Sequence, residues 1–224
     1  MMFDQRGHLY FFFDFISHNA WLAWHKMPAL AAKHGLILEP VPVLFAGLLQ
    51  AHKQIGPAEV PPKLNWMLWN VLRKAQQHNI PIAPPHTHPF NPLLPLRIAC
   101  CALPREQHLR LIHALFSATW AEGRAVSQAD VAKDIITEAG LDAEALFAQA
   151  HTDTVKAALR QNTEDAIKAG VFGVPSMKVG DELFWGFDDL PQLENYLSGA
   201  DPLNPDRNVY AGWQRVQPSA QRKR

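Results

Sequence analysis

The sequence predicts an α/β fold in which a strand–helix–strand unit is separated from a strand–strand–helix unit by a long run of helices. Three observations lead to this prediction. An aromatic run near the N-terminus is typical of a strand that is buried on both faces. Residues 46–169 carry helix signals and no strand signal of comparable strength. Strand character then returns in a short hairpin over 176–185.

The first unit begins with the continuous run His8-Leu9-Tyr10-Phe11-Phe12-Phe13-Asp14, which predicts a strand in the middle of a sheet. After a break at Ser17-His18-Asn19, residues Ala20 to His34 are rich in helix formers, and Pro28 is a point where that helix kinks or divides. Leu36 to Leu44 reads as a second strand whose prolines suit a sheet edge. A helix between two strands favours a right-handed crossover, so we expect these two strands to be parallel.

The helical region follows, and proline-rich loops separate its segments. Helices are predicted over Leu64–His78, Leu94–Leu103, Arg105–Glu122, Ser127–Ala139 and Ala143–Ala169, the last broken near 151–153. Ser127-Gln128-Ala129-Asp130 resembles a capping box. In the last unit, Ser176–Val179 and Glu182–Trp185 form a hairpin around Gly180-Asp181, and a helix over 189–197 begins where Asp188 and Asp189 can accept bonds from free N–H groups.

This order of elements is that of a thioredoxin-like fold, βαβ plus ββα, interrupted by an all-helical insert. We therefore expect residues 1–45 and 170–200 to form the thioredoxin-like domain and 46–169 the insert. Residues 201–224, with their prolines and the terminal Gln-Arg-Lys-Arg, are expected to be a mobile tail.

Charge and composition limit the partners. Lys+Arg and Asp+Glu are both 21, so no net field attracts nucleic acid or a membrane surface, and no apolar run is long enough to be a signal or a membrane span. The two cysteines, Cys100 and Cys101, are adjacent and are expected to be reduced, buried thiols, which favours a cytoplasmic location. His86-Thr87-His88 lacks further ligands nearby, so we expect no metal site.

Three motifs carry a resemblance to a known family. These are Phe13-Asp14-Phe15-Ile16-Ser17, then Gly170-Val171-Phe172-Gly173-Val174-Pro175-Ser176, and finally Phe184-Trp185-Gly186-Phe187-Asp188. In this order, around a helical region, they resemble the 2-hydroxychromene-2-carboxylate isomerases. This glutathione-dependent family is related to kappa-class glutathione transferases and, more remotely, to DsbA-like oxidoreductases.

The resemblance implies a catalytic role for Ser17, whose hydroxyl would hydrogen-bond the glutathione sulfur and favour its thiolate. Placed between a strand and a helix, Ser17 can equally be an ordinary N-cap. Val174-Pro175 is expected to be a cis bond close to Ser17, and Val174 to pair with the cysteinyl backbone. Asp188, with Trp185, Gly186, Phe187 and Asp189, would hold the γ-glutamyl end, although plain helix capping is the competing interpretation.

The same resemblance assigns further binding residues in the insert. Lys63 is a candidate for binding the glycine carboxylate of glutathione or an acidic substrate, whereas Trp66 and Trp69 are expected in the core. Substrate contacts are implied for Phe45, Ala46, Asn91 and Arg97. A surface lysine and a turn-fixing asparagine are the competing interpretations for Lys63 and Asn91.

The implied activity is a cis–trans isomerisation of an aromatic 2-hydroxychromene-2-carboxylate or arylidene pyruvate in aromatic-compound breakdown. Glutathione thiolate would add to a conjugated carbon, and elimination would follow bond rotation. The protein would be an isomerase, as a monomer or a homodimer. Ser17-His18-Asn19-Ala20 stands where redox relatives have Cys-x-x-Cys, so thiol–disulfide exchange is excluded there.

Two alternatives stay open. A kappa-type glutathione transferase would release a stable glutathione conjugate. A non-catalytic thioredoxin-like binding module would show no heat of binding with glutathione. His18, Asn19 and Asp189 depart from the family pattern and keep the second alternative open. His18 is expected to be a surface loop residue rather than a base or a substrate contact.

Overall fold

A four-stranded sheet forms the centre of the computed structural model, which describes residues 3–203 and 208–217. Its strands are β1 His8–Phe13, β2 Ile37–Pro42, β3 Ser176–Val179 and β4 Glu182–Trp185, in the order β2-β1-β3-β4. β2 lies parallel to β1, whereas β3 is antiparallel to both β1 and β4. The thioredoxin-like topology is therefore as predicted, with β1 inside and β2 at the edge.

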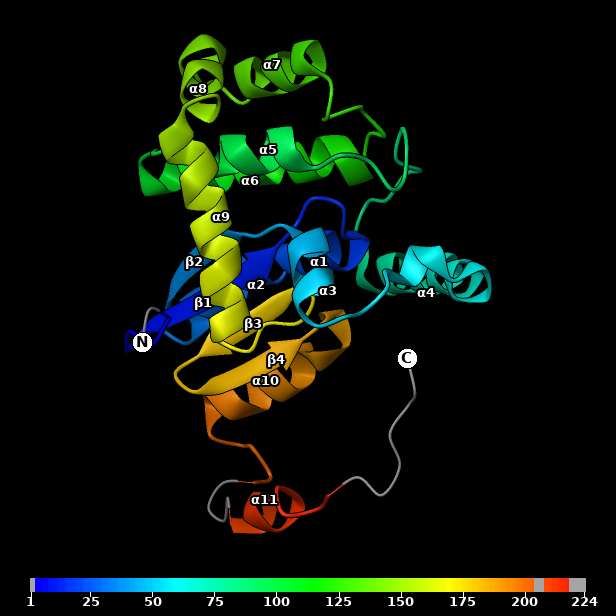
Figure 1. The fold of residues 1–224 in the computed structure, drawn as a ribbon, viewed down its shortest axis with the longest axis vertical. Helices are drawn as coiled ribbons and strands as arrows, with labels where there is room; N and C mark the ends of the chain where they lie inside the picture. The colour runs from blue at the N-terminus through cyan, green and yellow to red at the C-terminus, as the bar shows by residue number, and fades with distance from the viewer. Residues whose placement is uncertain (1–2, 204–207, 218–224) are drawn as a thin grey trace.

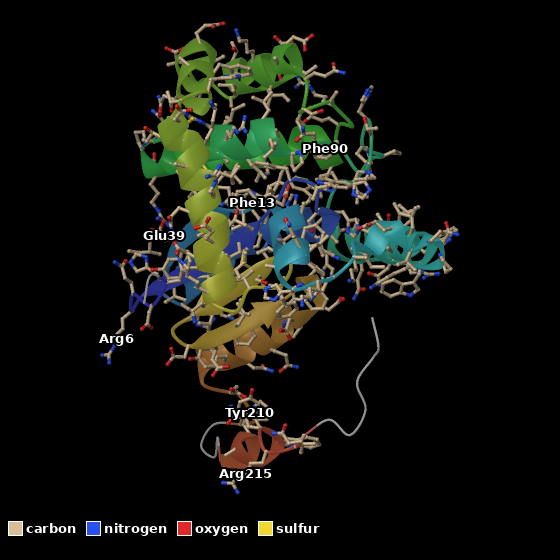
Figure 2. All side chains as sticks on the ribbon, viewed as in Figure 1. Arg6, Phe13, Glu39, Phe90, Tyr210 and Arg215 are labelled. Carbon is tan, nitrogen blue, oxygen red and sulfur yellow. The ribbon has the colours of Figure 1, made fainter. Side chains whose placement is uncertain are left out.

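Both faces of β1 are buried, which explains its unbroken apolar sequence. Leu9, Phe11 and Phe13 belong to the larger core, together with buried residues of the first helices and of the insert. Tyr10 and Phe12 belong to a second core with residues of the helices that cover the other face. Phe13 lies at the centre of the molecule in Figure 2, and its ring centroid is 5.4 Å from that of Phe116. The sheet is thus joined to the insert through continuous aromatic packing.

Helices surround this sheet (Figure 1). Two precede β2: α1 His18–Trp24 and α2 Met27–Lys33. The insert contributes α3 Phe45–Ala51, the 3-10 turn η1 Pro57–Glu59, α4 Pro61–His78, α5 Leu93–Ala99, α6 Arg105–Trp120, α7 Ala129–Glu138, α8 Ala143–Ala150 and α9 Asp153–Lys168. The chain closes with η2 Phe187–Asp189, α10 Leu190–Ser198 and α11 Asn208–Trp213.

Several predicted breaks are confirmed. The first helical segment divides between Trp24 and Met27, just before Pro28, because proline is tolerated only in the first turn of a helix. The long helix over 143–169 is interrupted at 151–152, where Thr152 accepts a hydrogen bond from the N–H of Val155 and starts α9. α3 was missed, since the sequence shows no signal for it and Phe45 begins it without a side-chain cap.

Two cap predictions are wrong. The N-cap of α7 is Gln128, and its side chain makes no capping bond, so Ser127 and Asp130 form no capping box. α10 begins at Leu190, after η2; Asp189 occupies its N-cap position, but its side chain makes no capping hydrogen bond. The tail contains the short helix α11, where no element was expected; residues 204–207 and 218–224 lie outside the described residues, and mobility stays a prediction.

Candidate functional site

Ser17 lies where the strand–helix–strand unit at the N-terminus meets the segment that leads into the strand–strand–helix unit. Its hydroxyl accepts a hydrogen bond from the N–H of Ala20 at 3.1 Å, which makes it the N-cap of α1. The same hydroxyl donates to the carbonyl of Val174 at 3.3 Å, across 157 residues of sequence. The Val174–Pro175 bond is cis. Both the cis bond and its closeness to Ser17 are as predicted, and the capping role coexists with them.

The buried side chain of Asp14 fixes the loop that precedes Ser17. Its side chain is fully buried, and its two oxygens accept hydrogen bonds from the N–H groups of Ile16 at 3.1 Å and Phe45 at 2.9 Å. Burial raises the pKa of Asp14 to about 7, and the two backbone bonds oppose that rise. One carboxylate therefore fixes the Ser17 loop and the start of α3 together.

Two residues of the helical insert also hydrogen-bond this loop. The indole N–H of Trp120, at the end of α6, donates to the carbonyl of Phe15 at 2.8 Å. The Nε2 atom of His88 lies 3.1 Å from the carbonyl of Ile16, and burial lowers the pKa of His88. The sequence analysis gave no functional role to Asp14 or Trp120. The one signal for Asp14 is an acid at the end of a fully buried strand, where an unpaired charge is rare.

His18 follows Ser17 and is buried, with 6% of its surface exposed, so the expectation of a surface histidine is wrong. Its ring lies edge-on to Trp120 at a centroid distance of 5.7 Å. Burial, with His88 and Lys74 nearby, lowers the pKa of His18 to about 4, so the ring is neutral at pH 7. Among the described residues, buried His18 Nδ1 and Asn19 Oδ1 have no hydrogen-bond partner.

The second side of the site is the turn from β4 into η2. The N–H of Gly186 donates to the carbonyl of Pro175 at 2.8 Å, which fixes this turn beside the cis bond. Gly186 has a φ of 83°, a conformation that suits glycine. Trp185 is 52% exposed, and its ring passes so close to Gly173 that a Cβ there would lie 2.5 Å from Nε1. Phe187 is buried.

Asp188 and Asp189 have separate partners. The Asp188 carboxylate is 2.6 Å from the ammonium of Lys74 on α4. Lys74 was not among the site residues predicted from the sequence. Asp189 accepts a hydrogen bond from the N–H of Trp185 at 3.0 Å and so stabilises the turn. Asp188 is therefore exposed at the surface while it is paired with Lys74.

The remaining predicted residues are spread over the insert. Phe45 and Ala46 form the first turn of α3, and Asp14 ties that turn to the Ser17 loop. Lys63 is exposed in the first turn of α4. Asn91 accepts a hydrogen bond from the N–H of Leu93, the turn-fixing role named as its alternative. Arg97 lies on α5, and its buried Nε has no partner among the described residues.

Two tryptophans of α4 are not in the core. Trp66 is 60% and Trp69 64% exposed, because the buried face of α4 is formed by Met67, Val71 and Ala75. The prediction that the two rings are buried is wrong. Their spacing of three residues puts both rings on one side of the helix, but the side that faces the core is the one with apolar residues at four-residue spacing.

Both cysteines are free thiols at the C-terminal end of α5. Cys101 is buried and Cys100 is partly buried. Burial raises the pKa of Cys100 to about 12 and that of Cys101 to about 11, so both are protonated at pH 7. Within the described ranges, no group of three or more His, Cys, Asp or Glu side chains is arranged to hold a metal ion.

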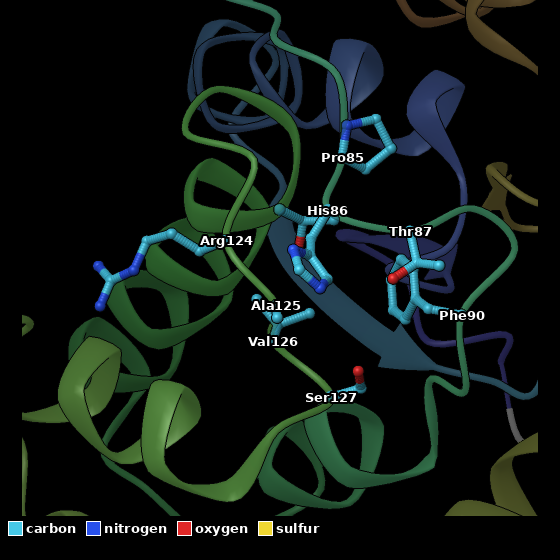
Figure 3. A pocket seen from close by; sticks show the side chains of 9 residues that line it. Pro85, His86, Thr87, Phe90, Arg124, Ala125, Val126 and Ser127 are labelled. Carbon is cyan, nitrogen blue, oxygen red and sulfur yellow. The ribbon is translucent and has the colours of Figure 1, made fainter.

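Two cavities are relevant. Figure 3 shows the smaller, where the loop of Pro85 to Phe90 faces residues 124–127; its volume of about 10 Å³ has room for a water molecule but not for an organic ligand. The larger, of about 770 Å³, lies between α2, α4 and α10. Lys74 and Asp188 both line it. No helix in 3–203 or 208–217 has the length and apolar character of a membrane span.

Comparison with known proteins agrees with this geometry. The family model of the DSBA-like thioredoxin domain matches residues 8–198, so the chain belongs to that family. A 2-hydroxychromene-2-carboxylate isomerase of Sphingobium xenophagum is 31% identical over 192 residues, which cover 84% of this chain and 96% of that protein. A solved structure of a 2-hydroxychromene-2-carboxylate isomerase superposes with a TM-score of 0.79 at 25% identity, covering 93% and 99% of the two chains.

Within the DsbA-like fold, the chain thus belongs to the family of 2-hydroxychromene-2-carboxylate isomerases, and the expected isomerase class is confirmed at this level. The relation to kappa-class transferases is also found. Glutathione s-transferase kappa 2 of Caenorhabditis elegans is 27% identical over 206 residues, covering 84% of this chain and 90% of that protein.

Proposed function

We propose that this protein is a glutathione-dependent cis–trans isomerase of 2-hydroxychromene-2-carboxylate or a closely similar arylidene pyruvate, with Ser17 as the catalytic residue. The single observation that carries the proposal is the meeting of Ser17 with the cis Val174–Pro175 bond in a chain of this family. The site has no cysteine at either end of residues 17–20, so a thiol has to come from a bound molecule.

The residues present fit glutathione. The buried polar atoms of His18 and Asn19 that lack partners lie beside Ser17, where a peptide would supply hydrogen bonds. Val174, partly buried and next to Ser17, is the candidate for strand-like pairing with an extended peptide. Asp188 is a surface carboxylate suited to an ammonium group, and Lys63 is an exposed cation suited to a carboxylate.

When bound, glutathione supplies a thiolate that adds reversibly to a conjugated carbon of the substrate. Ser17 has the task of stabilising that sulfur. Its hydroxyl hydrogen points to the Val174 carbonyl at 3.3 Å, long for an O–H···O bond, so redirecting it to a nearby anion costs little. The N-terminus of α1 adds a favourable field for negative charge.

Other residues orient the substrate and stabilise charge that develops on it. Phe45 and Ala46 form an apolar wall that is fixed relative to Ser17 through Asp14. Neutral His18 can donate or accept a hydrogen bond at the site. Asn91 and Arg97 are the candidates for the substrate carboxylate, and Arg97 has a buried Nε without a partner in the described part of the chain.

A kappa-type glutathione transferase is the second candidate function, and the similarity to kappa-class transferases favours it. The two activities share thiolate activation but differ in the outcome. A transferase consumes one glutathione for each product, whereas the isomerase regenerates it. Counting free thiols before and after many turnovers separates them.

Replacing Ser17 tests the assignment. Ser17→Ala removes the hydrogen bond to the sulfur, so we expect the pKa of bound glutathione to rise and turnover at neutral pH to fall about ten- to a hundredfold. Binding of glutathione should change little, and turnover should recover in part at higher pH. The measurements are the thiolate absorbance of bound glutathione against pH and the rate of isomerisation.

Ser17→Thr is the matched control, because threonine keeps both the hydroxyl and the N-cap of α1. The cap alone accounts for about 1 kcal/mol of stability, which a thermal melt of each variant measures separately. If Ser17→Ala changes neither the thiolate titration nor the turnover, Ser17 is only a helix cap and the catalytic assignment fails.

A further inference from the structure

His18, the first residue of α1, contains a buried polar atom without a partner directly beside Ser17. The side chain is buried, and its Nδ1 atom has no hydrogen-bond partner among the described residues. Ser17 and Asn19, on either side of His18, are partly exposed. The ring therefore lies just below the surface of the Ser17 loop. Unpartnered buried side-chain atoms are few in the described part of the chain, and the others belong to His8, Asn19, His25 and Arg97.

The His18 ring is held in place by the groups that fix the Ser17 loop. It packs edge-on against Trp120 at a centroid distance of 5.7 Å, and the His88 ring contacts the same indole at 5.6 Å. Both Trp120 and His88 also hydrogen-bond the backbone just before Ser17. Packing thus fixes the position of the His18 ring relative to Ser17.

An unpaired Nδ1 atom in this place destabilises the folded protein. A buried nitrogen that has lost its water and gained no partner costs free energy, whereas an apolar side chain of similar size fills the same space without that cost. Packing against Trp120 does not require an imidazole. A partner that arrives with a ligand explains a buried polar atom that the fold does not use.

We propose that His18 is a second catalytic residue, whose Nδ1–H donates a hydrogen bond to the substrate oxygen that becomes negative during the reaction. This inference rests on the proposed function and deepens it. The family resemblance gives His18 no role, because His18 departs from the family pattern. In an arylidene pyruvate that oxygen belongs to the 2-oxo group, which is conjugated with the carbon that takes up the sulfur.

The electron balance of the isomerisation requires a donor of this kind. When the substrate forms its bond to sulfur, the electron pair of its C=C bond moves toward the 2-oxo oxygen. The pair returns when the bond to sulfur breaks after rotation, and no proton is gained or lost over the cycle. A donor that shares its proton without giving it up therefore stabilises the charged state and lets the double bond form again.

A neutral imidazole meets this requirement. Burial, with His88 and Lys74 nearby, lowers the pKa of His18 to about 4, so the ring has one N–H and no charge at pH 7. A charged imidazolium is a much stronger acid. It would transfer its proton to the substrate and leave a saturated product bound to sulfur. A neutral ring keeps its proton beside a negative oxygen.

His18→Leu tests the proposal, and His25→Leu is the matched control. His25 lies at the other end of α1 and also has a buried ring nitrogen, Nε2, without a partner among the described residues. Each substitution removes an unpaired polar atom, so the midpoint of denaturant unfolding at pH 7 should stay unchanged or rise. Only His18→Leu should lower kcat, by about ten- to a hundredfold, and it should leave the thiolate titration of bound glutathione unchanged.

His18→Asn is the rescue variant, because its amide nitrogen takes the place of Nδ1 and keeps a donor there. It should retain most of the kcat of the unaltered protein, whereas His18→Leu should not.

Calorimetry gives a readout that does not depend on turnover. The protein is first saturated with γ-Glu-2-aminobutyryl-Gly, a glutathione analogue that has a methyl group in place of the thiol and cannot add to a double bond. The probes are 4-phenyl-2-oxobut-3-enoate and 4-phenylbut-3-enoate, which differ only in the 2-oxo group. The unaltered protein and His25→Leu should bind the 2-oxo probe about three- to tenfold more tightly, and His18→Leu should bind the two probes equally.

Three results would overturn the inference. If His18→Leu lowers the unfolding midpoint and keeps kcat, the ring is structural. If His18→Leu weakens the binding of glutathione but not that of the 2-oxo probe, Nδ1 binds the peptide instead of the substrate. If His25→Leu lowers kcat as much as His18→Leu does, the effect is not specific to the Ser17 loop. Absence of glutathione-dependent turnover in the unaltered protein would reject the proposed function and the role of His18 with it.

Discussion

The loop that carries Ser17 and the turn that carries Asp188 form two sides of one candidate site, yet they are held in different ways. The Ser17 loop is fixed by buried hydrogen bonds to Asp14, Trp120 and His88, which come from three different parts of the chain. Asp188 is held by one ion pair with a largely exposed carboxylate. Rigid, buried contacts suit a group that must meet a reacting sulfur, whereas an exposed pair can exchange partners with a ligand.

The largest effect is expected where the sheet meets the insert. Phe13 is fully buried between Phe15 and Phe116, with ring centroids 5.2 and 5.4 Å away. Phe13→Ala should lower the free energy of unfolding by about 3–5 kcal/mol, because it leaves a cavity under the Ser17 loop. Denaturant unfolding measures this change.

Trp66→Ala is the control for the Phe13 prediction, since it removes a larger aromatic ring that is 60% exposed. Its cost should lie within about 0.5 kcal/mol. Equal losses for the two variants would mean that the aromatic packing described for β1 does not support the loop.

Asp14, which fixes the Ser17 loop, makes the stability of the folded protein depend on pH. Its pKa in the folded protein, about 7, is above its ordinary value of 3.8, so the folded state binds the proton more tightly than the unfolded state. Stability contributed by this group is therefore highest below pH 4 and is lost as the pH rises to 7. Between pH 5.5 and 8 the unaltered protein should lose about 2 kcal/mol relative to Asp14→Asn, which has no titrating group there.

His18 and His25 act in the opposite direction. Their folded pKa values of about 4 lie below 6.5, so the stability that they contribute is lost as the pH falls below 6.5. Both variants contain these histidines, and the difference between the two unfolding curves isolates Asp14. Parallel curves from pH 5.5 to 8 would show that the carboxyl is ionised throughout and that its burial is compensated.

Local signals explain which parts of this comparison the sequence predicts. The buried strand and the hairpin each depend on a few neighbouring residues and were predicted from them, whereas the cis bond at Pro175 was predicted from the resemblance to the family. The partners of the Ser17 loop were missed because Trp120 is 105 residues from Phe15 and His88 is 72 from Ile16. Local patterns do not pair such distant residues, and the contact between Ser17 and Val174, 157 residues apart, was predicted only through the family resemblance.

The errors have a physical pattern as well. Trp66 and Trp69 were assigned to the core from their spacing on one helical face, although Met67, Val71 and Ala75 provide the buried stripe. His18 was assigned to the surface as a loop residue, although it begins α1 and its ring packs against Trp120. In both cases tertiary packing overrides the average preference of the residue type. The Lys74–Asp188 pair was missed for a related reason, since 114 residues separate the partners.

The smallest effect is expected at the thiols, and it tests whether the chemistry is confined to the Ser17 side. Cys100 and Cys101 lie at the end of α5 in the insert, and burial keeps both protonated at pH 7. Cys101 donates weak hydrogen bonds to the carbonyls of Arg97 and Leu146, both at 3.5 Å. Replacing both cysteines with alanine should therefore cost at most about 2 kcal/mol of stability and leave glutathione-dependent turnover unchanged. Iodoacetamide should likewise react slowly with the folded protein and without loss of activity. A folded double variant with no turnover would place the reacting sulfur in the protein rather than in glutathione, and the contrast between a rigid catalytic loop and an exchangeable binding turn would no longer describe this site.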